Sequence, residues 1–139
     1  MRILAVDPGD KRIGLAISDP SGTIANPMTV LNHVSRPIDA ASIVAVALEQ
    51  GAGLIVVGQA LDENNELGPA ARKAGRMAEA IRSQCSIPVV LWDESGSTQA
   101  VRQAGIDLGV SRFKRRGHLD QLAATVILQT YLDAQSKPF

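Results

Sequence analysis

The chain has 139 residues, of which 45% are apolar and 20% charged, and this is enough for one domain with a substantial core. Its 14 basic and 14 acidic residues give a formal net charge of zero, which excludes a histone-like polycation but not a local basic patch. The single cysteine, Cys85, excludes an internal disulfide, and no apolar run approaches the roughly 18 residues that span a bilayer.

The first residues, Met1–Leu4, predict the start of a strand and lack the features of a signal peptide. We therefore expect a cytoplasmic protein with no membrane partner, folded as a single α/β domain over residues 1–139.

Three short strands are predicted at the start of the chain, over Arg2–Asp7, Ile13–Asp19 and Gly22–Val30. The first contains a continuous apolar run, which is typical of a strand buried on both faces of a sheet. The gaps between these strands are shorter than the dozen residues of a parallel crossover, so we expect antiparallel pairing.

A helix is predicted from Ser35-Arg36-Pro37, which supply a cap and a first-turn proline, to a stop at Gly51. Within it four apolar residues recur at helical spacing: Ile38, Ala41, Ala45 and Leu48. The buried strand Leu54–Gly58 follows, and the strand–helix–strand order predicts that it lies parallel to the first strand.

A second helix and a last strand follow a polar, acidic loop over residues 59–68. Pro69 opens the helix, and the buried strand covers Pro88–Trp92. One face of the helix carries Ala70, Ala74, Met77 and Ile81.

The end of the chain is predicted to be helical, with a basic loop in between. A short third helix is expected from Ser95 to about Asp107, then the basic loop Gly109–His118, then a final helix over Leu119–Asp133. The final helix has an apolar stripe made of Leu119, Leu122, Ala123, Val126 and Ile127.

Carboxylates stand at three places that the predicted fold brings toward one sheet edge. Asp7 ends the first strand, Asp93 and Glu94 end the last strand, and Asp120 lies in the opening turn of the final helix. If the two strands are parallel, their acidic ends lie at the edge where open α/β sheets bind ligands. Asp120 shares a helical row with Ala124 and Ile127, which tilts it toward the sheet.

Each carboxylate also has a purely structural explanation. Asp7 is compatible with a turn, Asp120 with a first-turn carboxylate on the helix dipole, and Asp93-Glu94 with a solvated loop. Gathered together, however, these groups would repel one another unless cations lay between them. Oxygen ligands without a His or Cys cluster favour Mg²⁺ or Mn²⁺ over zinc. Two such ions about 4 Å apart can activate water and stabilise the leaving oxygen in phosphodiester cleavage.

A basic cluster lies just ahead of Asp120 and consists of Arg112, Lys114, Arg115 and Arg116. A local positive surface suits a phosphate backbone, and a solvated charge run is the alternative. Lys11 and Arg12, in the turn after Asp7, are candidates for phosphate contact and equally for an exposed hairpin.

Five segments, in order along the chain, resemble the YqgF family, also called RuvX: Val6–Ala16, Ile55–Gly58, Val90–Glu94, Leu119–Ala124 and Ile127–Leu132. The resemblance spans essentially the whole chain. It implies a ribonuclease H-like fold with a five-stranded mixed sheet flanked by helices. It also implies a divalent-metal-dependent nuclease of ribosome biogenesis that matures the 5′ end of 16S rRNA, with Holliday junction resolution as the alternative activity.

By motif position, the resemblance implies that Asp7, Glu94 and Asp120 are the catalytic acids and the ligands of two Mg²⁺ or Mn²⁺ ions. It implies that Asp93 is an accessory ligand or orients its neighbour. Lys11, Arg12 and the basic cluster would position structured or precursor RNA, or branched DNA, on a monomer or homodimer.

The chain departs from the family pattern at two places. Ser95 stands where the family usually has an arginine, which removes a bidentate phosphate contact. Gln59-Ala60 follows Gly58 where the family tends to have Gly-x-Pro, and the loop 61–67 is acidic. A catalytically weakened nucleic-acid-binding module therefore stays open as a second hypothesis. An actin-like phosphotransferase fragment, whose hairpin also opens with Asp-x-Gly, is a third.

Overall fold

The computed structural model describes residues 1–60, 68–93 and 112–136, and for 112–121 it describes the helical backbone alone. This part of the chain forms the following elements in order: β1 (Arg2–Pro8), β2 (Arg12–Ser18), β3 (Ala25–Asn32), α1 (Arg36–Glu49), β4 (Ala52–Gln59), α2 (Pro69–Arg82), β5 (Val89–Asp93) and α4 (Arg112–Ser136).

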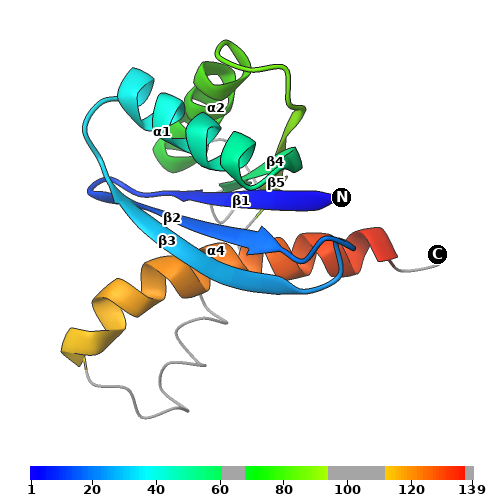
Figure 1. Cartoon of the computed structure of the whole chain (residues 1–139). Coiled ribbons are helices and arrows are strands. Elements are labelled where there is room, and N and C mark those ends of the chain that lie inside the picture. The colour runs from blue at the N-terminus through cyan, green and yellow to red at the C-terminus, as the bar shows by residue number, and fades with distance from the viewer. Residues whose placement is uncertain (61–67, 94–111, 137–139) are drawn as a thin grey trace.

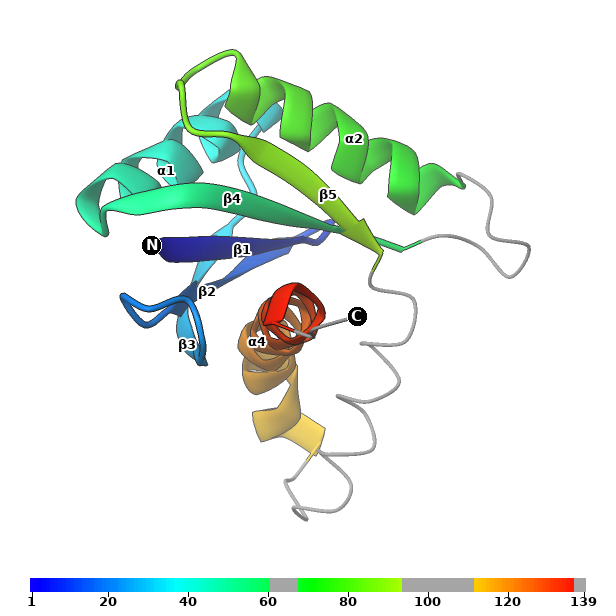
Figure 2. The same ribbon diagram turned by 90° about the vertical axis from the view of Figure 1, so that its right-hand side faces the viewer.

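The five strands form one mixed sheet in the order β3-β2-β1-β4-β5. β1 pairs antiparallel with β2, and β2 antiparallel with β3, whereas β1, β4 and β5 are mutually parallel. The antiparallel start and the parallel crossover predicted from the sequence are thus confirmed. Helices α1 and α2 cover one face of the sheet and α4 covers the other, giving three layers (Figures 1 and 2).

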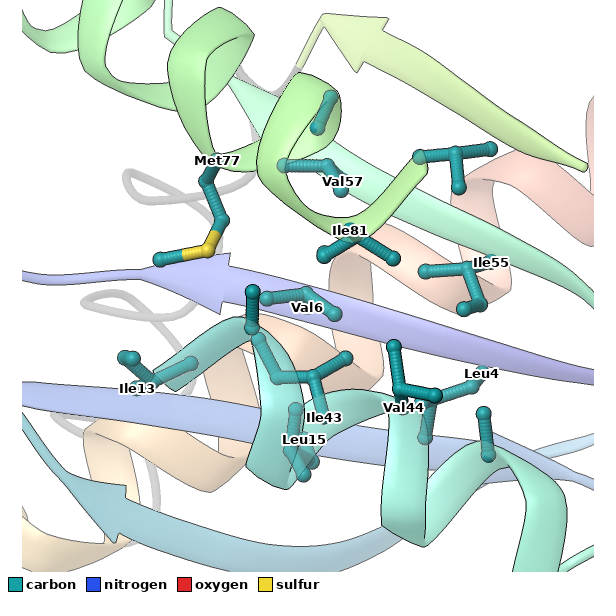
Figure 3. Packing of buried hydrophobic residues seen from close by; sticks show 14 of the residues in the cluster. Leu4, Val6, Ile13, Leu15, Ile43, Val44, Ile55, Val57, Met77 and Ile81 are labelled. Atoms are coloured by element: carbon teal, nitrogen blue, oxygen red, sulfur yellow. The ribbon is translucent and has the colours of Figure 1, made fainter. Parts of the chain in front are cut away.

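The larger core lies between the sheet and the pair α1 and α2. Alternate residues of the central strands point into it, because successive side chains of a strand face opposite sides. Figure 3 shows this packing, in which Val6 and Val57 of the strands meet Ile43 of α1 and Ile81 of α2. The two helices also contact each other, which closes this layer.

The smaller core lies under the other face of the sheet and is covered by α4. It contains Ile3 and Ala5 of β1, Val56 of β4, and a helical row whose buried members are Ala124, Ile127, Leu128 and Leu132. The predicted stripe on the final helix is therefore displaced by about one residue: Leu122 and Val126 are half-buried, while Ala124 and Leu128 are fully buried.

The packed face of α1 differs from the row noticed in the sequence. Ile38 is 52% exposed and Leu48 is 64% exposed, whereas Ile43 and Ala47 are fully buried. Nearly every position of this helix is apolar or small, so spacing alone does not choose a face. For α2, Ala74, Met77 and Ile81 are buried as predicted, and Ala70 is exposed.

The third strand begins three residues later than predicted, at Ala25 rather than Gly22. The cause is Asp19, whose carboxylate accepts hydrogen bonds from the amides of Thr23 (2.8 Å) and Ile24 (2.9 Å). These bonds fold the residues before Ala25 into a turn instead of a strand.

The final helix is longer than predicted. It starts at Arg112, so the stretch 112–118, expected to belong to a basic loop, is helical. Arginine and lysine are good helix formers, and no proline interrupts the segment. The predicted third helix, from Ser95 to about Asp107, lies outside the described residues, as does the acidic segment 61–67. No helix in the described ranges has the length and apolar character to cross a lipid bilayer.

Candidate active site at the carboxyl edge of the sheet

The carboxyl ends of β1, β4 and β5 lie at one edge of the sheet because these strands are parallel. Val6 pairs with Val57, and Val57 pairs with Leu91, so the three strands are in line one residue before Asp7. With neighbouring strands about 4.8 Å apart, the ends of β1 and β5 are separated by about 10 Å. The ends of the strands that carry Asp7 and Asp93 are therefore near each other at this edge.

Asp7 lies within β1 and pairs with Gly14 of β2, so it does not start the turn that follows. Ile3 and Ala5 pack in the core beneath α4, whereas Leu4 and Val6 pack beneath α1 and α2. By strand alternation Asp7 therefore faces the α4 side. It is half-buried.

Glycines flank Asp7 on both neighbouring strands. Gly14 is its partner on β2, and Gly58 of β4 follows Val57 and pairs with Trp92. Gly14 lies two residues before Ala16, and Gly58 lies two residues after Val56. Both glycines therefore face the α4 side, as Ala16 and Val56 do. A hydrogen in place of a side chain leaves space beside the Asp7 carboxylate, either for α4 to approach closely or for a bound group.

Asp93 and Asp7 fall on opposite faces of the sheet. Val90 and Trp92 pack toward α4, whereas Val89 and Leu91 pack toward the other helices, and Asp93 continues the second set. Asp93 is exposed. This placement does not bring Asp93 to the Asp7 carboxylate, and its two predicted roles, as an accessory ligand or in orienting its neighbour, stay predictions. Glu94 lies outside the described residues.

Helix α4 runs antiparallel to β1, so its N-terminal half lies toward the edge where β1 ends (Figure 1). Asp120 belongs to this half and comes two turns after the helix start at Arg112, not in the first turn. The alternative explanation of Asp120 as a carboxylate on the helix dipole therefore loses its basis. Asp120 is on the helical row of Ala124 and Ile127, both of which are buried against the sheet.

Two side-chain links fix α4 across the sheet. Gln129 accepts a hydrogen bond from the Ala25 amide (3.0 Å) at the start of β3 and donates one to the Thr23 carbonyl (3.2 Å). On the opposite side, Trp92 of β5 donates its indole N–H to the Thr130 hydroxyl (3.0 Å). The Trp92 and Tyr131 rings also meet edge to face with centroids 5.3 Å apart. These links hold the helix that carries Asp120 in place over the sheet.

Among the side chains that the structure describes, no group of three or more His, Cys, Asp or Glu residues is arranged to hold a metal ion. Glu94 and the side chain of Asp120 are not among them, so the ligand set Asp7, Glu94 and Asp120 stays a prediction. The histidine at this end of the sheet, His33, is hydrogen-bonded through Nδ1 to the buried Asp39 of α1. Asp39 also accepts the Val34 amide.

The hairpin after Asp7 is tight and is attached to α2. A Cβ on Gly9 would lie 2.2 Å from the Arg12 carbonyl oxygen, so only glycine fits there. Lys73 of α2 donates to the Gly9 carbonyl (2.7 Å) and to the Asp10 carboxylate (2.7 Å). The hydrogen bond and charge of Lys73 lower the pKa of Asp10.

The two predicted phosphate contacts of the hairpin lie next to Asp7. Lys11 is exposed at the tip, and Arg12 is half-exposed at the start of β2. Arg12, Gly14 and Ala16 are alternate residues of β2, so Arg12 faces the α4 side of the sheet together with Asp7. Arg112, Lys114, Arg115 and Arg116 lie in the first turns of α4, and their side chains are outside the described part.

Three arginines that the sequence reasoning did not select line a hollow on the α1 and α2 side: Arg36, Arg72 and Arg76. In the sequence these residues are separate charges on amphipathic helices. Only the packing of α1 against α2 brings them together, so composition and motifs gave no signal for them.

Comparison with known proteins assigns the chain to one group. The family model of RuvX, described as Holliday junction resolvase, matches residues 1–134. A relative from Thermoanaerobacter pseudethanolicus is 43% identical over 97% of this chain and 98% of its own length. Another from Pelotomaculum thermopropionicum is 37% identical over 99% of this chain and 90% of its own length. Both carry the name "Putative pre-16S rRNA nuclease".

Solved structures with the same fold include two Holliday junction resolvases. Thermus thermophilus RuvC in complex with a Holliday junction substrate superposes with a TM-score of 0.60 and 19% identity, over 97% of this chain and 95% of that one. Fowlpox virus resolvase with junction DNA gives a TM-score of 0.58 and 14% identity, over 99% and 100%. The ribonuclease H-like fold expected from the sequence is confirmed.

Proposed function

The chain belongs to the RuvX family, a family of nucleases, and on that premise we propose that it hydrolyses phosphodiester bonds in the precursor of 16S rRNA at the 5′ end. We assign the reaction to a single domain over residues 1–139 that uses Asp7, Glu94 and Asp120 with two divalent ions. A ribosomal-precursor substrate implies a cytoplasmic protein.

The observation that carries this proposal is the position of Asp7. It stands at the carboxyl end of the central strand, on the face covered by α4, which also carries Asp120. The parallel strand β5 ends at the same edge directly before Glu94. Glu94 follows Trp92 by two residues, so continued strand alternation would turn it toward α4, as Val90 and Trp92 are. We infer from this strand register and alternation that the three acidic residues, far apart in the sequence, would meet at one edge and on one side of the sheet.

The donor chemistry at this edge fits Mg²⁺ or Mn²⁺. The Asp7 carboxylate is a hard oxygen ligand, and the glycines on both sides of it leave space for a bound group. The nearby His33 is engaged with Asp39 instead. Divalent ions bound by Asp7, Glu94 and Asp120 would supply Lewis acidity and lower the pKa of a water molecule.

The proposed hydrolysis inserts one water molecule into the nucleic-acid backbone. The water oxygen forms a bond to phosphorus, the bond from phosphorus to the 3′ oxygen breaks, and the water proton ends on that oxygen. The products are a 5′-phosphate and a 3′-hydroxyl.

The residues around Asp7 have positioning roles in this proposal. Asp7 is rigidly placed because its strand is paired on both sides. Arg12 carries a positive charge on the same side of the sheet, two residues nearer the hairpin than Gly14, the partner of Asp7. Lys11 and the basic cluster 112–116 would hold the phosphate backbone on either side of the acids without selecting sequence.

The substitution Asp7→Asn tests the proposal. With Mg²⁺ or Mn²⁺, cleavage of precursor 16S rRNA should fall at least about a hundredfold, the order of loss when a group that stabilises transition-state charge is removed. Affinity for the RNA should stay the same or rise, because a negative charge near the phosphates is removed.

Asp133→Asn is the matched control, because this exposed α4 carboxylate accepts a hydrogen bond from Gln129 (3.0 Å), which an asparagine oxygen can also accept. It should leave cleavage unchanged. Cleavage by Asp7→Asn at the wild-type rate in Mn²⁺ would remove the proposed mechanism.

Holliday junction resolution is the second candidate, because the family description names it. A resolvase must cut two strands symmetrically, so this activity requires a homodimer, whereas RNA trimming needs only a monomer. Side-by-side cleavage of precursor rRNA and a four-way DNA junction, with the oligomeric state measured in parallel, separates the two. Absence of metal-stimulated cleavage on both would favour the weakened binding module that Ser95 suggests.

A further inference from the structure

Two hollows adjoin each other on the side of the sheet away from α4. The first, of about 580 Å³, lies along α2 and is lined by Arg36, Arg72, Gly75, Arg76, Glu79 and Ala80. The second, of about 400 Å³, reaches from α2 to the β1–β2 hairpin at Gly9. Both are bordered by Arg36 and Arg76, so together they form one groove. The groove ends at Gly9, which follows Asp7 by two residues along the chain.

The acidic residues of this groove are already engaged. Glu79 is ion-paired with Arg82, Asp10 with Lys73, and the buried Asp39 accepts hydrogen bonds from His33 and Val34. By contrast, Arg36, Arg72 and Arg76 are exposed, and their guanidinium groups make no hydrogen bond or ion pair within residues 1–60, 68–93 and 122–136.

We propose that this arginine groove, defined by Arg36, Arg72 and Arg76, is a second contact surface for the phosphate backbone of the nucleic-acid substrate. It deepens the proposed nuclease function and rests on it. A strand held at Asp7 would continue past the hairpin into the groove, on the opposite side of the sheet from the basic cluster of α4. The substrate would then be held on two faces of the molecule.

The chemistry of the groove favours a polyanion over an acidic peptide. Guanidinium groups bind phosphates through two parallel hydrogen bonds, and the three arginines, from two helices, line one hollow of the surface. Protein interfaces are usually centred on apolar or aromatic anchors. The first hollow offers only Gly75 and Ala80 as apolar lining, which is too little for such an anchor.

Salt dependence of binding tests the proposal. The affinity of the whole chain for a labelled RNA duplex with a single-stranded 5′ extension is measured in EDTA over a range of KCl concentrations. For Arg72→Gln with Arg76→Gln, the slope of log K against log salt should fall by about 2, with about tenfold weaker binding at 0.15 M salt. Arg36→Gln alone should lower the slope by about 1.

Arg2→Gln is the matched control, since it removes the same charge at the opposite end of β1. It should leave the slope unchanged, and all variants should keep the circular dichroism spectrum and melting temperature of the wild type. An unchanged slope in the double variant would overturn the proposal. An equal loss in the Arg2 control, or equally strong competition by poly-glutamate, would also overturn it.

A cleavage assay on the same proteins separates this proposal from the nuclease function. If the slope falls as expected while the wild type, assayed separately with Mg²⁺ or Mn²⁺, does not cleave RNA, the groove stands and the nuclease proposal fails. If wild-type and double-variant proteins cleave saturating RNA equally and share one slope, the nuclease stands and the groove proposal fails.

Discussion

Gly9 shows how strongly one residue controls the candidate site. A methyl group at Gly9 would lie 2.2 Å from the Arg12 carbonyl, a backbone atom that cannot move alone. We predict that Gly9→Ala destabilises the protein by roughly 1–3 kcal/mol and lowers the melting temperature, because the hairpin must open.

Gly75→Ala is the matched control for Gly9→Ala. Gly75 lies within α2, and a Cβ there would meet nothing within 4 Å, so this change should raise stability by about 0.5–1 kcal/mol. Thermal or urea melts compare the two variants. Equal effects of the two substitutions would show that the hairpin is not the tight turn described.

Asp19 predicts a dependence of stability on pH. The amide of Ile24, the hydroxyl of Ser21 and the amide of Thr23 donate to its carboxylate and hold its pKa well below 3.8. A carboxyl whose pKa is lowered by folding stabilises the protein above its unfolded pKa of about 3.9 and loses that effect as the pH falls through its folded value.

We therefore predict that Asp19→Asn lowers the melting temperature at pH 6 and that the difference from wild type narrows from about pH 4 downward. Thermal melts at pH 6, 4 and 2.5 measure this. A difference that stays constant over this range would mean that the charged form of Asp19 makes no contribution.

At single positions, the sequence was informative where chemistry and strand periodicity coincide. Asp7 could be selected because it directly follows a buried apolar run, and parallel strand ends share an edge. Residue type did not distinguish Asp93 from Glu94; the alternation of β5 assigns Asp93 to the face away from Asp7. The arginine groove could not be predicted, because it depends on how α1 packs on α2.

Among the helices, α1 gives the clearest lesson. Its apolar and small residues occur on every side, so the row Ile38, Ala41, Ala45 and Leu48 was as regular as the row that is buried. For α4 the boundary was missed, because basic residues suggested a loop while their helix propensity favours continuation. The directions of the first four strands could be predicted, since short gaps favour antiparallel pairing and a helical crossover favours a parallel strand.

Two isoleucines of α1 test which face is packed. Ile43 is fully buried and Ile38 is 52% exposed. We predict that Ile43→Ala costs about 2–5 kcal/mol because it leaves a cavity in the larger core, whereas Ile38→Ala changes stability by less than about 0.5 kcal/mol. Urea denaturation gives both values. A larger loss for Ile38→Ala would mean that α1 is rotated or that this face is covered in solution.

In the whole molecule, one sheet separates two cores. Helices α1 and α2 pack on the larger core and carry the arginine groove. Helix α4 packs on the smaller core, and its N-terminal half carries Asp120 and the basic cluster. The acidic edge lies between them, where β1, β4 and β5 end. The proposed reaction at this edge would then take place where substrate can be held from both sides.

The central claim is that Asp7, Glu94 and Asp120 together bind hard divalent ions, and Mn²⁺ binding tests it without any substrate. Titration followed by electron paramagnetic resonance should show Mn²⁺ bound by the wild type and by Asp133→Asn. Binding should be at least about tenfold weaker in each of Asp7→Asn, Glu94→Gln and Asp120→Asn, because each removes one charged ligand. Wild-type affinity for Mn²⁺ in all three variants would contradict the account.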